Sequence, residues 1–209
     1  MDELDAAIEA GASAVGLVSS MPSGPGVIPD ERVAEIADRV PPGVDSFLLT
    51  SQQDAESIIE QHRRARTSTL QLVDKLPAGA HGQLRAALPG IRLVQVVHVV
   101  DDRAIEEAAA AAEFVDAVLL DSGNPTLDVK ELGGTGRRHN WAVSARIRRQ
   151  LDVPVFLAGG LNPDNVAEAI DTVQPFGLDV CTGVRDEAFA LDRQKLDHFG
   201  SAITSAGGR

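Results

Sequence analysis

Short apolar runs rich in valine and leucine alternate with longer amphipathic stretches along the whole chain. This alternation is typical of strands and helices that wind around a parallel sheet. The pattern predicts seven strands, at 14–18, 46–49, 69–73, 91–99, 117–120, 153–157 and 178–181. It predicts eight helices, at 2–10, from 30 onward, and at 54–64, 83–87, 104–112, 141–150, 162–173 and 191–203.

The order of these elements favours an α/β fold, specifically a (β/α)8 TIM barrel at the compact end of its size range. Such a barrel begins with a strand, whereas this chain begins with a helix, so we expect a barrel that is incomplete or atypical at the first strand. The neighbouring strands would then have unpaired edges, which invite pairing with another chain. We therefore expect either a terminus that plugs the barrel or a homodimer that covers the gap. We expect a single domain over 1–204 and a flexible tail at 205–209.

The charge balance limits the partners of the chain. There are 19 Lys+Arg against 31 Asp+Glu, which gives a formal net charge of −12. Nucleic acids and anionic membranes require a basic face that this balance does not supply, so we expect neither as a partner. A local basic pocket for one small phosphorylated ligand remains compatible with the charge.

Other composition features bear on location and cofactors. The acidic start lacks the features of a signal peptide, and no apolar run is long enough to span a membrane, so we expect a cytoplasmic protein. Cys181 is the only cysteine, which excludes an intramolecular disulfide. The five histidines are scattered without metal-ligand spacing, so we expect no metal and no other cofactor.

Glycines follow the last two predicted strands, where ligands bind in parallel α/β folds. Gly159 and Gly160 precede a helix start at Asn162, and Thr182-Gly183 follows the next strand. Backbone N–H groups at such turns can bind phosphate. The sequence therefore predicts a phosphate site here, although the glycines could also serve only to shape tight turns.

Asp121 ends an apolar strand, where desolvation could raise its pKa enough to make it a proton donor. The alternative is an Asp that only anchors the following loop. That loop contains Gly134, Gly136 and Arg137, and it could close over an anionic substrate or be a mobile surface excursion.

Several segments resemble the phosphoribosylanthranilate isomerase family of tryptophan biosynthesis, in the family's order and near its spacing. They are Gly11-Ala12-Ser13-Ala14-Val15-Gly16-Leu17-Val18, Leu119-Leu120-Asp121-Ser122, Gly133-Gly134-Thr135-Gly136 followed by Trp141, Leu157-Ala158-Gly159-Gly160-Leu161-Asn162-Pro163-Asp164-Asn165-Val166 and Asp179-Val180-Cys181-Thr182-Gly183-Val184.

The resemblance implies a (β/α)8 barrel that performs a cofactor-free Amadori rearrangement of N-(5-phosphoribosyl)anthranilate. It implies that Asp121 is the general acid and that Gly159, Gly160 and Gly183 hold the substrate phosphate. Arg137 stands where the family usually has a lysine in its mobile loop.

The chain also departs from the family pattern. The family's general base is a cysteine on a first strand that would lie before Met1, and its His after the fourth strand is replaced by Val73. Proton transfer needs a base within hydrogen-bond reach. Cys181 is one candidate base, because a thiol near a helix N-terminus ionises more easily, and His98 and Asp74 are others.

These departures leave two further hypotheses open. The chain could be a divergent paralogue that acts on another phosphorylated sugar or metabolite through the same phosphate site. It could also be a non-catalytic protein that binds a phosphorylated ligand.

Overall fold

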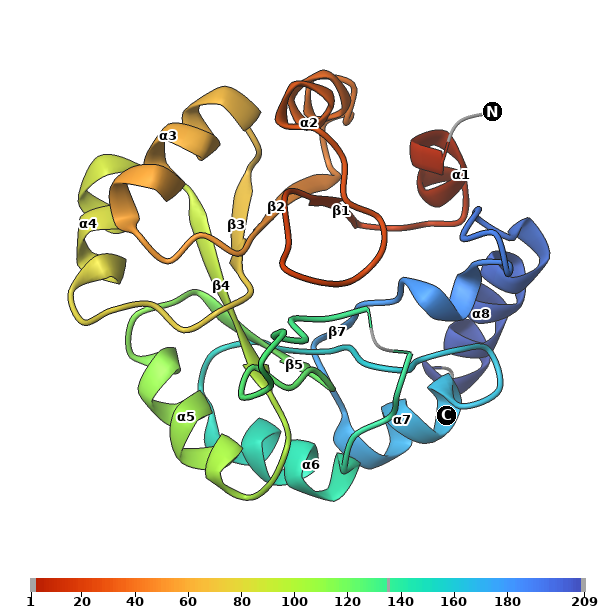
Figure 1. The fold of residues 1–209 in the computed structure, drawn as a ribbon. Helices are drawn as coiled ribbons and strands as arrows, with labels where there is room; N and C mark the ends of the chain where they lie inside the picture. The colour runs from red at the N-terminus through yellow and green to blue at the C-terminus, as the bar shows by residue number, and fades with distance from the viewer. Residues whose placement is uncertain (1–2, 135, 208–209) are drawn as a thin grey trace.

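The computed structural model describes residues 3–134 and 136–207, which form one parallel sheet surrounded by helices (Figure 1). The sheet has the order β1-β2-β3-β4-β5-β6-β7, which is also the order of the strands in the chain. The strands are β1 (Ala14–Val18), β2 (Asp45–Thr50), β3 (Thr69–Leu72), β4 (Arg92–His98), β5 (Ala117–Asp121), β6 (Val155–Leu157) and β7 (Gly177–Leu178). The helices are α1 (Glu3–Glu9), α2 (Asp30–Ala37), α3 (Ala55–Ala65), α4 (Ala80–Ala87), α5 (Arg103–Ala112), α6 (Trp141–Gln150), α7 (Val166–Val173), α8 (Arg193–Gly207) and the short 3₁₀ helix η1 (Thr182–Val184).

The predicted α/β fold is confirmed, with differences at the ends of some elements. The helix expected from 162 begins instead at Val166, because Asn162 caps a turn: its side-chain oxygen accepts hydrogen bonds from the backbone N–H groups of Asp164 (2.9 Å) and Asn165 (3.1 Å). At the other end, α8 continues to Gly207. Residues 205–207 of the expected flexible tail are therefore helical.

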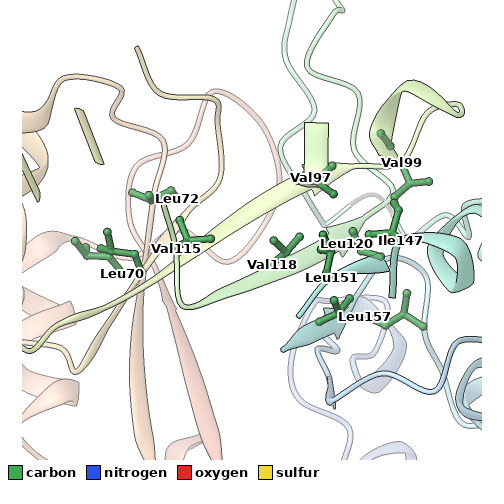
Figure 2. Packing of buried hydrophobic residues seen from close by; sticks show 14 of the residues in the cluster. Leu70, Leu72, Val97, Val99, Val115, Val118, Leu120, Ile147, Leu151 and Leu157 are labelled. Carbon is green, nitrogen blue, oxygen red and sulfur yellow. The ribbon is translucent and has the colours of Figure 1, made fainter. Parts of the chain in front are cut away.

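One face of the sheet packs against the helices and forms the main core. This cluster includes Val118, Leu120, Val155 and Leu157 from strands and Ile147 from α6, all with at most marginal exposure. Figure 2 shows Leu120, Leu157 and Ile147 together within this layer. Because side chains alternate between the two faces of a strand, the residues between these positions point to the inside of the curled sheet.

The inner face carries its own apolar cluster, which contains no helical residue. It includes Val94 and Val96 of β4, Leu119 of β5 and Ala158 after β6. Leu132, from the loop that joins β5 to α6, also belongs to it. The loop therefore folds over the carboxyl ends of the strands and covers part of the interior.

The two edge strands differ from those of a closed barrel. Within the part of the chain that the structure describes, β1 pairs only with β2, and β7 only with β6. Outside the sheet, Glu3 of α1 forms an ion pair with Arg185 (2.8 Å), and Glu9 forms one with Arg193 of α8 (2.8 Å). These contacts join the first and last parts of the helical layer across the gap. The expected terminal plug or covering homodimer stays a prediction.

Candidate active site

Two carboxyl groups lie on the inner face at the carboxyl ends of neighbouring strands. Leu119 of β5 is in register with Phe156 of β6, which is in register with Gly177 of β7. Two residues further along these strands, the inward positions are Asp121, Ala158 and Asp179. The ladder continues to this level, because the N–H of Asp179 donates to the carbonyl of Leu157 (2.9 Å). Only the small Ala158 stands between the two acidic positions.

Asp121 is buried, with 7% of its surface exposed. Its Oδ1 accepts a hydrogen bond from the N–H of Ser122 (2.7 Å). A Cβ atom on Gly159 would lie 2.9 Å from Oδ1, and one on Gly133 would lie 3.0 Å from Oδ2. The absence of a side chain at Gly159 and Gly133 therefore makes room for the carboxyl group of Asp121.

Asp179 has an unusual electrostatic environment. The residue is exposed at the open side of the site, and the protein atoms around it desolvate the charged form of its carboxyl group. This desolvation, together with the nearby negative charge of Asp121, raises the pKa of the Asp179 carboxyl to about 6. The Asp179 carboxyl therefore keeps its proton to a higher pH than an isolated aspartate would.

The loop between β5 and α6 covers the predicted phosphate glycines. A Cβ on Gly160 would lie 2.5 Å from the carbonyl carbon of Arg137, and one on Gly136 would lie 3.5 Å from Oγ1 of Thr182. The structure thus brings Gly136, Arg137, Gly160 and Thr182 together. In the described part of the chain, the backbone N–H groups of Gly160 and Gly183 donate to no protein acceptor.

Other predicted phosphate residues have structural roles. The side-chain oxygen of Asn162 is used in the turn before α7. Gly134 permits contact between two loops, since a Cβ there would lie 2.9 Å from Cδ of Pro25. The Arg137 guanidinium forms an ion pair with Glu131, so a bound phosphate would compete with that carboxylate.

Gly183 lies so close to the preceding segment that an alanine cannot fit without movement, since its Cβ would lie 1.8 Å from the carbonyl oxygen of Leu161. We expect Gly183→Ala to destabilise the fold by about 1–3 kcal/mol, which at about 2–4 °C per kcal/mol lowers the Tm by several degrees. Gly82, in α4, is the matched control because its Cβ would meet nothing within 4 Å. Gly82→Ala should leave the Tm unchanged or raise it slightly. Equal Tm values for the two variants, measured by calorimetry, would contradict the close contact.

The structure does not support the expected ionisation of Cys181. Burial raises the pKa of its thiol, and the nearby Arg185 only partly opposes this effect. The helix that follows, η1, is a single 3₁₀ turn of three residues. The expectation of an easily ionised thiol at a helix N-terminus was therefore wrong, because desolvation dominates there.

Of the other two candidate bases, Asp74 is engaged by hydrogen bonds, whereas His98 keeps a buried Nδ1 that has no hydrogen-bond partner in the described part of the chain. His98 is buried; its Nε2 lies 3.0 Å from the carbonyl oxygen of Val73, and a Cβ on Gly123 would lie 2.5 Å from its Nδ1. Asp74 accepts hydrogen bonds from Lys130 and from the N–H of Lys75. His98 of β4 is in register with Asp121 on the neighbouring strand, whereas Asp179 lies two strands away, so His98 stays a candidate base as well as Asp179.

Asp179 was missed as a site residue, although it belongs to a segment on which the family resemblance rests. The strand predicted at 178–181 placed it inside the strand, whereas β7 ends at Leu178 and Asp179 follows it. A single acidic residue in an apolar run near the end of the last strand was the available signal.

The described residues were also considered for a metal site and for a helix that could span a membrane. Within 3–134 and 136–207, no group of three or more His, Cys, Asp or Glu residues could hold a metal ion. Over the same residues, every helix is too short or too polar to span a membrane.

Comparison with known proteins identifies the family. Residues 1–200 match the family model described as N-(5'phosphoribosyl)anthranilate (PRA) isomerase. The N-(5'-phosphoribosyl)anthranilate isomerase of Halobacterium salinarum is 36% identical over 201 residues, which cover 96% of this chain and 89% of that protein. The crystal structure of phosphoribosyl anthranilate isomerase from Thermotoga maritima superposes with a TM-score of 0.80 at 29% identity, covering 98% of this chain and 92% of that one.

A second solved structure contains a ligand. It is a phosphoribosyl anthranilate isomerase in complex with reduced 1-(o-carboxyphenylamino)-1-deoxyribulose 5-phosphate, with a TM-score of 0.77 and 27% identity over 96% of this chain and 91% of that one. The strand order, the residues at the strand ends and these similarities lead to one conclusion: the chain belongs to the phosphoribosylanthranilate isomerase family.

Proposed function

We propose that this protein is an intramolecular oxidoreductase of the aldose–ketose isomerase class that converts N-(5-phosphoribosyl)anthranilate into 1-(o-carboxyphenylamino)-1-deoxyribulose 5-phosphate in tryptophan biosynthesis. The observation that carries the proposal is the placement of Asp121 and Asp179 at inward positions of the strand ends, beside glycines that a loop covers. Family membership supports the same reaction.

The rearrangement needs a proton donor and a proton acceptor. Asp121 donates a proton to the ring oxygen of the ribose, the bond from that oxygen to C1 breaks, and the nitrogen lone pair forms a C=N bond to C1. A base then removes the proton from C2, which gives an enolamine with a hydroxyl group on C2. The enolamine becomes the ketone when C1 gains a proton and the C2 hydroxyl loses one. No atom is gained or lost, so no cofactor is required.

Asp179 is our proposed acceptor of the C2 proton. It faces the same interior as Asp121, and the two carboxyl groups interact electrostatically. At pH values above about 6 the Asp179 carboxyl is ionised and can accept a proton. Burial raises the pKa of the Cys181 thiol, which makes it a weaker candidate for the acceptor.

The substrate phosphate would bind to the N–H groups of Gly160 and Gly183, under the residues 136–138 of the loop. We therefore expect ribose 5-phosphate to raise the Tm and ribose to leave it unchanged. A ligand at a hundred times its Kd stabilises the native state by about 2.7 kcal/mol. Scanning calorimetry with both sugars measures the difference, and equal shifts would contradict a phosphate site.

Complementation tests the proposed function in a cell. The gene should restore growth without tryptophan to a strain that lacks phosphoribosylanthranilate isomerase, and the Asp121→Asn variant should not. Failure of a soluble, folded wild-type protein would count against this substrate. The divergent paralogue on another phosphorylated sugar would then be the better account.

The remaining expectations about partners are also proposals. A second copy that covers the edges of β1 and β7 should appear as a dimer in light scattering after size exclusion. A terminal plug is the alternative, and a stable monomer whose strand edges are fully exposed would contradict both. Location in the cytoplasm and absence of nucleic-acid partners stay predictions from the sequence.

A further inference from the structure

A pocket beside the carboxyl pair contains a lysine that the proposed reaction does not use. The pocket has a volume of about 330 Å³ and lies at the carboxyl ends of β1, β2 and β3, under the β5–α6 loop. Its lining includes Ser20, Met21, Pro22, Asp74, Lys130 and Leu132. Leu132 precedes Gly133, which contacts Asp121, so the pocket adjoins the site of proton transfer.

Lys130 is fixed by contacts on both its side chain and its backbone. Its Nζ lies 2.5 Å from Oδ2 of Asp74, whose side chain is only 8% exposed. Its carbonyl oxygen accepts a hydrogen bond from the Ser23 hydroxyl (2.6 Å). The next residue, Glu131, exchanges two backbone hydrogen bonds with Asn124 (2.8 and 3.0 Å). The lysine is therefore held at the pocket rather than extended into solvent.

The Asp74–Lys130 pair can accept an additional anion. Oδ1 of Asp74 already accepts the N–H of Lys75 (2.8 Å), and Oδ2 accepts one of the three donors of Lys130. The ammonium group keeps two donors for a ligand without losing Asp74. Asp74 thus orients the lysine and balances its charge when the pocket is empty.

The walls of the pocket indicate what kind of anion fits. Met21, Pro22 and Leu132 provide apolar surface, and Lys130 provides the cation. The remaining walls carry the polar side chains of Ser20, Ser51, Gln53 and Asp74. This combination suits a flat apolar group that carries a carboxylate, and a phosphate would not use the apolar walls. The substrate in the proposed reaction contains one such group, its o-carboxyphenyl ring.

We propose that Lys130, oriented by Asp74, binds the carboxylate of the substrate's aromatic ring and is a specificity-determining residue. This inference rests on the proposed function and extends it by naming the residue that recognises the carboxylate. Lys130 is the cation that lines this pocket, whereas Arg137 and Arg138 pair with Glu131 and Glu168 and are not part of its lining.

Two ligands and three variants test this role by calorimetric titration. The ligands are reduced 1-(o-carboxyphenylamino)-1-deoxyribulose 5-phosphate and the same compound without its carboxyl group. The wild type should bind the carboxylated ligand about ten- to a hundredfold more tightly, as expected for a charge-assisted hydrogen bond. Lys130→Gln should bind both ligands equally, with the affinity of the wild type for the ligand without the carboxyl group.

Two further variants serve as controls. Lys130→Arg keeps the charge and should retain part of the preference. Lys75→Gln removes an exposed lysine that follows Asp74 in the chain and does not line the pocket, so it should behave as the wild type.

Each other outcome overturns the role of Lys130. If Lys130→Gln weakens both ligands by the same factor, the lysine only holds the loop. If the wild type binds both ligands with the same affinity, no residue recognises the carboxylate, while the proposed function still stands. If neither ligand binds the wild type, the proposed function fails together with this inference.

Discussion

Replacement of Asp121 with asparagine should lower kcat/KM for N-(5-phosphoribosyl)anthranilate by about 10²–10⁴, the usual contribution of a general acid or base. Asparagine has nearly the same shape and can still accept the hydrogen bond from the N–H of Ser122, so the fold should persist. The amide cannot deliver a proton to the ring oxygen. Steady-state rates and a thermal melt on the same sample separate the loss of chemistry from a loss of structure.

A matched control for this variant is Asp152→Asn. Asp152 is exposed and precedes β6, at the opposite end of the strand from the site. It should keep wild-type kcat/KM. A folded Asp121→Asn protein with a rate within a few-fold of the control would exclude Asp121 as the acid.

The variant Asp179→Asn should combine a large loss of activity with a gain in stability. If Asp179 accepts the C2 proton, kcat should fall by about a hundredfold or more. Desolvation and the charge of Asp121 raise the pKa of Asp179 to about 6 in the native state, above its value in the unfolded chain. The native state is therefore destabilised at pH values where the carboxyl is ionised, and the amide removes this effect.

The pH dependence fixes the sign of this stability change. A raised native pKa means that the favourable contribution is complete below the unfolded pKa, near 3.8, and is lost as the pH rises through about 6. The Tm advantage of Asp179→Asn over the wild type should therefore grow between these two values and then stay constant. An advantage that shrinks as the pH rises would contradict the assigned shift, and unchanged kcat would exclude Asp179 as the base.

The alternation of apolar strands and amphipathic helices was sufficient to predict the fold. β1 matches the predicted range 14–18, and α6 matches 141–150. The glycines around Asp121 and Gly160 were also identified from the sequence, because ligand sites in parallel sheets follow the strand ends. The strand and helix ranges and the glycines at the strand ends depend on residues that are close together in the chain, so they can be predicted from the sequence.

The partner of Asp121 could not be predicted in the same way, because it depends on pairing between strands. Asp179 lies level with Asp121 only because Phe156 is in register with Gly177. The ion pair that holds Lys130 of the β5–α6 loop could not be predicted, for a similar reason. Lys130 and Asp74 are 56 residues apart, and nothing local to either one indicates their ion pair. The pKa of Cys181 depends on burial, which the single turn after it does not reveal.

The central claim is that this chain isomerises N-(5-phosphoribosyl)anthranilate with the carboxyl pair at the ends of β5 and β7. Because the product has the mass of the substrate, its formation is best followed by NMR of the purified protein with substrate. Our account predicts signals of the aminoketose with the wild type and almost none with Asp121→Asn or Asp179→Asn. Conversion at the same rate in all three proteins, or a folded wild type that yields no aminoketose, would contradict it.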